Sequence, residues 1–406
     1  MSHDSQSSHD SQPNRSAEAT QLSDLTNRRE FCQWAALATG AAALAQPATA
    51  ATAADLADEA ARVISQLPHR YHGWPTVAKA PDGELLVVCS GGRESHVCPF
   101  GRVELMRSRD GGRNWTFPRT LLDGPIDDRD AGVLITSKGT ILVTTFTSLA
   151  YERSLAKLRS EPDSPRKQAW LGAHARLDEQ GRRDALGVWM IRSEDGGQTF
   201  SPPYRTQVNS PHGPVELRDG RLLYAGKRLW DGSGQVGVCV SKDDGQTWSW
   251  LANIPTRDGD DHNEYHELHA VEASNGDLIA QIRNHNKPNA GETLQSRSTD
   301  GGKTWSTPAS IGVWGLPSHL LRLQDGRLLM SYGYRRKPYG NQARLSEDDG
   351  QTWSEPITIS ADGIGGDLGY PSTVQLSERE LLTVWYERMA DSPRSVLRQR
   401  RWQLPS

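Results

Sequence analysis

Groups that can attack a substrate, transfer protons or bind an anion recur at two places in a sixfold pattern of this sequence. Each unit is an apolar run, a turn of the Asp-Gly type and a second apolar run. The sixth unit lacks the turn glycine and is aligned on Arg379. Nine residues before the turn stand Trp74, Asp130, Pro211, Glu267, Pro317 and Tyr370. Beside them lie His212 and His266, and directly after the second run come Arg93, Glu94, Lys227, Arg228, Arg283, Arg335 and Glu387.

These residue types predict distinct chemical roles. Tyr370 or a carboxylate such as Glu267 would act as a nucleophile or stabilise a developing positive charge. Glu94, His96 or Asp130 would transfer a proton, with a pKa tuned by burial.

The cations of the same edge predict binding of an anionic group. A guanidinium pairs with a carboxylate through two parallel hydrogen bonds, so arginines suit this task. Trp74 would stack on the face of a ring, and Arg129 stands among the acids of residues 127–130. The expected binding set comprises Arg93, Arg129, Trp74, His212, Arg228, His266, Arg283, Arg335 and Glu387.

The segment 258–269, DGDDHNEYHELH, invites a metal interpretation through His262, His266 and His269. Its spacing is not that of an H-E-x-x-H helix, and a junction of loop and strand would scatter the ligands. We therefore expect no metal, and a site role for His266 or Glu267 without one. Nothing in the sequence indicates a P-loop or a nucleotide cofactor.

Two alternating repeats define the elements that must position these residues. The octet S-x-D-x-G-x-[TN]-[WF] occurs five times, at 108–115, 193–200, 241–248, 298–305 and 346–353. The six units described above begin at the aligned positions and read as hairpins. Six hairpins alternating with five octet hairpins predict an all-β fold, a six-bladed β-propeller of four-stranded antiparallel blades whose sixth octet has lapsed.

Propeller geometry then separates the two faces. The Asp-Gly turns and the octets would lie on one face, where the octets are structural. The aligned positions and the ends of the second strands would lie on the opposite, funnel face. The segment 149–184 belongs to that face and is too long for an ordinary connection. Its pieces 151–162 and 166–177 predict short helices that either wall the pocket or form a passive surface insert.

The octets, known as Asp boxes, and the six blades resemble the sialidase/neuraminidase superfamily over roughly residues 68–403. The resemblance implies an exo-acting glycosidase with a tyrosine nucleophile, an activating glutamate, an aspartate acid/base and three arginines. Tyr370 matches the nucleophile in a Y-S-x-x-x-x-L-like context. Glu387 resembles the glutamate that steadies an arginine, and Arg93 the arginine after the first hairpin.

The sequence departs from that family at three positions. The arginine of the sialidase R-I-P motif falls on Gly73 in HGWP, and the glutamate that activates the tyrosine falls on Pro211. The acid/base loop before the first octet contains no aspartate. His96 stands near that position, with Glu94 two residues away.

The first fifty residues predict export. A polar lead-in precedes Arg28-Arg29, a mild apolar stretch and an A-x-A site at 48–50, which together are typical of a Tat-type signal. We expect residues 1–50 to be a disordered lead-in and a signal peptide that directs export through the Tat machinery, and residues 51–67 to be a linker or short helix. The propeller should span 68–406 and reside in the periplasm or outside the cell.

Composition limits the partners. The formal charge of −4 and the pI near 6.3 argue against nucleic acid. No apolar run reaches ~18 residues, so no membrane span is expected after signal removal. Only Cys89, Cys98 and Cys239 follow the signal, which argues against a disulfide framework.

The combined expectation is an exported exo-glycosidase that removes a terminal, acidic sugar from a glycan. One alternative is a polysaccharide lyase or another enzyme of uronic acids, in which His212 or His266 would abstract a proton. A second alternative is a carbohydrate-binding propeller without catalysis.

Overall fold

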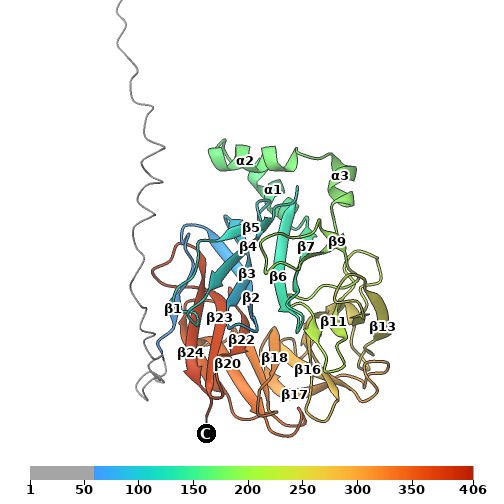
Figure 1. Cartoon of the computed structure of the whole chain (residues 1–406). Helices are drawn as coiled ribbons and strands as arrows, with labels where there is room; N and C mark the ends of the chain where they lie inside the picture. The colour runs from blue at the N-terminus through green and yellow to red at the C-terminus, as the bar shows by residue number, and fades with distance from the viewer. Residues whose placement is uncertain (1–58, 406) are drawn as a thin grey trace, which may run out of the picture. The chain divides into compact units, whose positions relative to one another are not determined.

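The alternating apolar runs fold into six separate antiparallel sheets of four strands each (Figure 1). The structure is a computed structural model and describes residues 59–405. The expected export signal at residues 1–50 lies outside this described part. Blades one to three are β2 (Tyr71–Lys79), β3 (Leu85–Arg93), β4 (Arg102–Ser108) and β5 (Arg119–Leu122); β6 (Asp127–Ile135), β7 (Ile141–Ser148), β8 (Val188–Ser193) and β9 (Tyr204–Arg205); and β10 (Val215–Glu216), β11 (Leu222–Lys227), β12 (Val236–Ser241) and β13 (Ser249–Asn253).

The remaining blades repeat this pattern. They are β14 (Tyr265–Glu272), β15 (Leu278–Asn284), β16 (Glu292–Ser298) and β17 (Ala309–Trp314); β18 (Ser318–Arg322), β19 (Leu328–Tyr334), β20 (Tyr339–Ser346) and β21 (Ile357–Gly363); and β22 (Leu368–Gln375), β23 (Glu380–Arg388), β24 (Ser395–Gln403) and β1 (Arg62–Val63). The first strand of each blade is innermost, and apolar side chains between neighbouring blades form the core. The six-bladed all-β propeller is thereby confirmed.

The sixth blade closes the ring with a strand from before the first blade. Arg62 of β1 pairs with Gln399 of β24, and the Ile64 amide donates to the Leu397 carbonyl. The outer strand of this blade is therefore not joined to its third strand by a turn, which explains why the sixth octet is missing. Residues 62–63 are a strand, where we expected a linker or a short helix.

The five octets form the turns between the third and fourth strands of blades one to five. In the last of them, Asp348 accepts hydrogen bonds from the Thr352 and Gln351 amides at 2.8 and 3.0 Å and from the Ser346 hydroxyl at 2.8 Å. These bonds hold the pKa of Asp348 down to about 2, although partial burial acts against them. Each octet aspartate thus stabilises its own turn, as the sequence predicts.

The insert between β7 and β8 contains three helices, α1 (Tyr151–Arg159), α2 (Pro165–His174) and α3 (Glu179–Asp184), drawn together in green in Figure 1. The two expected helices are confirmed. Ser164 caps α2 by accepting a hydrogen bond from the Lys167 amide, and Pro165 occupies the first helical turn. Trp170 is fully buried with Tyr151 and Cys98, so the insert packs onto the loop after β3.

Two further features concern the described residues as a whole. No helix among them is long and apolar enough to cross a membrane. Cys89, Cys98 and Cys239 are buried free thiols.

Candidate active site

Four of the six aligned positions adopt an unusual backbone conformation at the start of the inner strand. Trp74, Asp130, Glu267 and Tyr370 have φ of 54°, 46°, 40° and 53°, and each lies at a β-bulge. A left-handed φ costs a non-glycine residue roughly 1 kcal/mol or more, and it turns the side chain out of the regular strand alternation. Pro211 and Pro317 occupy the same position in blades three and five, where the proline ring requires a negative φ.

Tyr370 and Glu267 meet on the face where the inner strands of blades six and four begin. The Tyr370 hydroxyl donates a short hydrogen bond to Glu267 Oε1. Arg283 Nη1 donates to the Tyr370 oxygen at 3.0 Å and to Glu267 Oε2 at 2.5 Å. One phenol, one carboxylate and one guanidinium, supplied by blades four and six, thus form a closed network.

The electrostatics of this network suit an activated tyrosine. Burial would raise the pKa of Glu267, but the Arg283 charge and the Tyr370 hydrogen bond lower it below its usual range. Burial and the Glu267 charge hold the pKa of Tyr370 well above its ordinary value. The phenol is therefore protonated at neutral pH, and an ionised carboxylate is in place to accept its proton.

Arg335 approaches Tyr370 from blade five. Its guanidinium carbon lies 5.8 Å from the centre of the Tyr370 ring, and its Nε donates to the Leu368 carbonyl at 3.0 Å. Within residues 59–405 its terminal nitrogens form no ion pair. Arg283 and Arg335 therefore present two guanidiniums beside the same phenol.

Asp130 is enclosed next to this network. It is 4% exposed, and its Oδ1 has no hydrogen-bond partner among the described residues. Burial raises the pKa of Asp130 to about 7; the Arg129 charge opposes this shift and the Glu267 charge adds to it. At neutral pH this carboxyl group is therefore present in both its protonated and its ionised form.

A second polar cluster forms where blades one and six meet. His96 Nδ1 lies 2.9 Å from Asp367 Oδ1, and the Tyr71 hydroxyl donates to the same carboxylate oxygen at 2.9 Å. The His96 side chain is 49% exposed, and its ring packs edge-on against Trp74 at 5.0 Å between centroids. The cluster thus combines a fixed ring nitrogen with an accessible one.

Several predicted site residues are engaged elsewhere. Arg93 is fully buried and forms a bidentate ion pair with Asp127 at 2.5 and 2.9 Å, so it braces blades one and two. The Arg93 and Arg129 guanidinium carbons lie 5.0 and 4.6 Å from the Trp74 ring centre. Trp74 is 1% exposed and in this conformation offers no open face for stacking.

Three more predicted residues lie away from the Tyr370 network. Glu94 accepts a hydrogen bond from Trp170 Nε1 at 2.9 Å and holds the insert. Arg228 pairs with Asp231 and packs over Trp250 of the outermost strand of blade three. Glu387 is buried and accepts hydrogen bonds from Arg398 and Trp385 within blade six.

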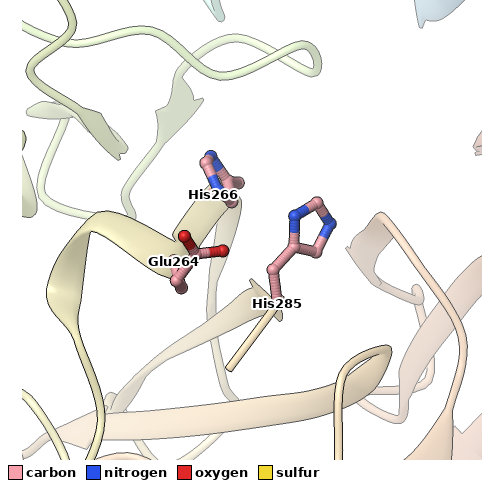
Figure 2. Close-up of side chains that lie close together, drawn as sticks. All are labelled: Glu264, His266 and His285. Atoms are coloured by element: carbon pink, nitrogen blue, oxygen red, sulfur yellow. The ribbon is translucent and has the colours of Figure 1, made fainter. Parts of the chain in front are cut away.

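His266 belongs to a small cluster with Glu264 and His285 (Figure 2). One potential ligand atom of each lies within 4.8 Å of the others, a spacing compatible with a metal ion. However, Arg283 Nε donates to His285 Nε2 at 2.8 Å. A neutral imidazole that accepts there carries its proton on Nδ1, the nitrogen that Figure 2 shows facing His266 and Glu264. That protonation state favours a hydrogen-bonded cluster over a metal centre.

His212 lies deeper, near the propeller axis. It packs with His269 and His319 at centroid distances of 5.3 and 5.1 Å, and with the Tyr370 ring at 6.5 Å. Burial holds the pKa of all three histidines below the usual range. They line a cavity of about 340 Å³ below the site.

The structure changes one correspondence made from the sequence. The tyrosine-activating glutamate was placed at Pro211, but Glu267 is the residue that accepts the Tyr370 hydrogen bond. Because the six blades have similar sequences, the alignment assigned the glutamate to blade three, whereas it belongs to the neighbouring blade four. Sequence reasoning also missed Asp367 and His285, although they stand three residues before Tyr370 and two after Arg283, close to residues already singled out.

A propeller with Asp-box turns and a tyrosine–glutamate–arginine network on its funnel face defines a protein of the sialidase-like, BNR-repeat class. The profile of the BNR repeat-like domain family matches residues 163–382, more than half of the chain, and the chain belongs to that family. The match to a xyloglucanase from Paenibacillus sp. extends over 170 residues at 32% identity and covers 37% of this chain. This match spans only 16% of the xyloglucanase.

Solved structures share the fold. A protein of unknown function from Dyadobacter fermentans superposes with a TM-score of 0.70 at 23% identity, covering 86% of this chain and 99% of that one. The NanB sialidase of Streptococcus pneumoniae gives 0.58 at 15% identity, covering 86% and 70%. The intramolecular trans-sialidase of Ruminococcus gnavus gives 0.59 at 14% identity, covering 82% and 94%. At these identities the likeness concerns the fold alone.

Proposed function

We propose that this protein is an exo-acting glycoside hydrolase that removes a terminal acidic sugar through a tyrosine nucleophile. The observation that carries the proposal is the Tyr370–Glu267–Arg283 network. A buried phenol is a poor nucleophile until a base accepts its proton, and Glu267 is hydrogen-bonded to it for that transfer. The twin arginine Arg28-Arg29 supports export of the enzyme, which detection of the processed chain in the periplasm would test.

In the proposed reaction the Tyr370 oxygen attacks the anomeric carbon as its proton passes to Glu267. The bond to the leaving oxygen breaks, and that oxygen is protonated. Water then cleaves the glycosyl–tyrosine bond, so the product retains its anomeric configuration. Arg283 stabilises the phenolate during attack, and Arg335 offers its free nitrogens to the substrate carboxylate.

The test is release from a panel of aryl glycosides of N-acetylneuraminic acid, glucuronic acid and rhamnose, together with xyloglucan. We expect release of an acidic sugar, retention of configuration by proton NMR, and a loss of at least about 100-fold in kcat for Tyr370→Phe and Glu267→Gln. Tyr332→Phe is the matched control, because that hydroxyl bonds Gln342 in blade five.

Other outcomes would replace the proposal. Cleavage restricted to rhamnosides or xyloglucan would reject an acidic substrate. An unsaturated product from a uronic-acid polymer would identify a lyase. Binding of glycans without any turnover would identify a carbohydrate-binding propeller.

A further inference from the structure

We propose that His96 and Asp367 form the acid/base dyad of this site, with His96 as the catalytic residue and Asp367 as its positioning residue. The inference rests on the proposed function and adds to it the source of the proton for the leaving group. His96 lies in the loop between β3 and β4, and Asp367 stands directly before β22. The two residues are 271 positions apart and meet only when the ring closes.

The hydrogen bonds of the dyad assign its protons. Asp367 Oδ1 accepts from the Tyr71 hydroxyl at 2.9 Å and lies 2.9 Å from His96 Nδ1. The Tyr71 proton is used in this bond, so His96 Nδ1 must supply its own proton to the carboxylate. The Nε2 atom is then the nitrogen that exchanges a proton, and it makes no hydrogen bond to residues 59–405.

The surroundings of Asp367 keep its carboxylate ionised. Burial would raise its pKa, but hydrogen bonds from His96, Tyr71 and Ser395 lower it below the ordinary value. The Tyr386 hydroxyl adds a contact at 3.2 Å to Oδ1, and the Ser395 hydroxyl donates to Oδ2 at 3.0 Å. A fixed carboxylate at Nδ1 selects one tautomer of the imidazole and holds the ring in one orientation.

The dyad lies next to the nucleophile across a single layer of aromatic rings. Trp74 packs edge-on against both His96, at 5.0 Å, and Tyr370, at 6.4 Å. The Tyr386 ring lies 5.8 Å from Tyr370 while its hydroxyl contacts Asp367. A sugar seated on Tyr370 would therefore have its leaving group within the region that His96 faces.

The other two candidate proton donors are less suited. Glu94 is occupied by Trp170 Nε1 and by Arg166 of the insert. Asp130 is 4% exposed and lies beside Glu267, on the nucleophile's side of the network. Of the three, His96 alone combines a fixed orientation with an accessible reactive atom.

Every proton in the two proposed steps is accounted for. As the Tyr370 oxygen bonds to the anomeric carbon, the leaving oxygen takes the proton of His96 Nε2. In the second step a water oxygen attacks the anomeric carbon, the bond to Tyr370 breaks, and His96 Nε2 takes the water proton. The Glu267 proton returns to the Tyr370 oxygen, and the resting state is restored.

The decisive experiment compares two leaving groups in His96→Gln, Asp367→Asn and the control His69→Gln, an exposed histidine in the segment before β2. On a disaccharide, whose leaving alcohol needs a proton, we expect kcat to fall about 100- to 10,000-fold in His96→Gln. On a dinitrophenyl glycoside, whose leaving group needs none, the fall should stay under about tenfold. In Asp367→Asn the loss of kcat on the disaccharide should be smaller than in His96→Gln but larger than about tenfold. The limb of the pH profile that reports the acid should also shift in this variant.

The outcomes separate this inference from the proposed function. Equal losses on both leaving groups in His96→Gln, with an active wild type, would overturn the dyad and leave the tyrosine mechanism standing. A wild type inactive on every glycoside would reject the proposed function and the dyad with it. Nitrogen-15 NMR supplies a readout besides turnover: His96 should be protonated at Nδ1 in the wild type and lose that preference in Asp367→Asn. A wild type that lacks the proton on His96 Nδ1 would also overturn the dyad.

Discussion

Asp130 allows a quantitative test of the electrostatics at the site. Burial raises its pKa to about 7, against roughly 3.9 in an unfolded chain. A difference of about three units corresponds to about 4 kcal/mol between the protonated and ionised forms. The Glu267 charge supplies part of this shift, so the figure describes the two carboxyl groups together.

The sign follows from which state holds the proton. The folded protein keeps the Asp130 proton up to about pH 7, whereas the unfolded chain loses it near pH 4. The stabilisation is therefore complete below about pH 4 and lost as the pH rises through 7. Between pH 5 and pH 8 the wild type should lose about 2.5 kcal/mol of unfolding free energy through this group.

Asp130→Asn removes the titration and keeps the shape of the protonated acid. Asparagine also tolerates the positive φ of 46° at this bulge. The difference in unfolding free energy between variant and wild type should shift by about 2.5 kcal/mol in favour of the variant from pH 5 to pH 8. Equilibrium urea unfolding at four pH values measures it.

The comparison needs a control, because several buried histidines titrate with the opposite sign. The exposed Asp391→Asn should follow the wild type at every pH. If the Asp130→Asn difference is the same at pH 5 and pH 8, the carboxyl group is not held in its protonated form, and our account of the pair with Glu267 fails.

Two further predictions concern the histidines. Burial lowers the pKa of His319 to about 3, so the folded protein stays neutral there while the unfolded chain gains a proton below about pH 6.5. The free energy of unfolding should therefore fall as the pH drops from 6.5 towards 3. Between pH 7 and pH 5, His319→Phe should lose about 2 kcal/mol less of its unfolding free energy than the wild type, as measured by urea unfolding. Parallel pH dependences of the two proteins would contradict this. Dialysis against EDTA should leave glycoside turnover unchanged, because the Arg283 hydrogen bond occupies the His285 lone pair; activity lost on chelation and restored by zinc would show that a metal displaces that bond.

Much of the architecture could be predicted because its signals are local. Each octet specifies its own turn, with Asp348 bonded to groups within four residues. The Asp-Gly spacing placed Trp74, Asp130, Glu267 and Tyr370 at one level of the fold, and all four occupy equivalent bulges with positive φ. The insert helices followed from composition and length in the same way.

The partners of those residues could not be predicted, because they come from distant parts of the chain. Tyr370 and Glu267 are 103 residues apart, and the sixfold repeat left the choice of blade open. The sequence predicted that Arg93 binds an anionic substrate, but in the folded protein it forms a bidentate ion pair with Asp127. The closing strand β1 is only two residues long, which is too short for a recognisable strand pattern in the sequence.

The sequence by itself thus determined the six blades, the five stabilised turns and the level at which polar groups gather, since these depend on contacts within each repeat. Only the tertiary structure decided which of those groups meet. The ring must close before Asp367 reaches His96 or Glu267 reaches Tyr370. The strength of a buried contact depends on the charges and burial around it, and residues from several blades supply both.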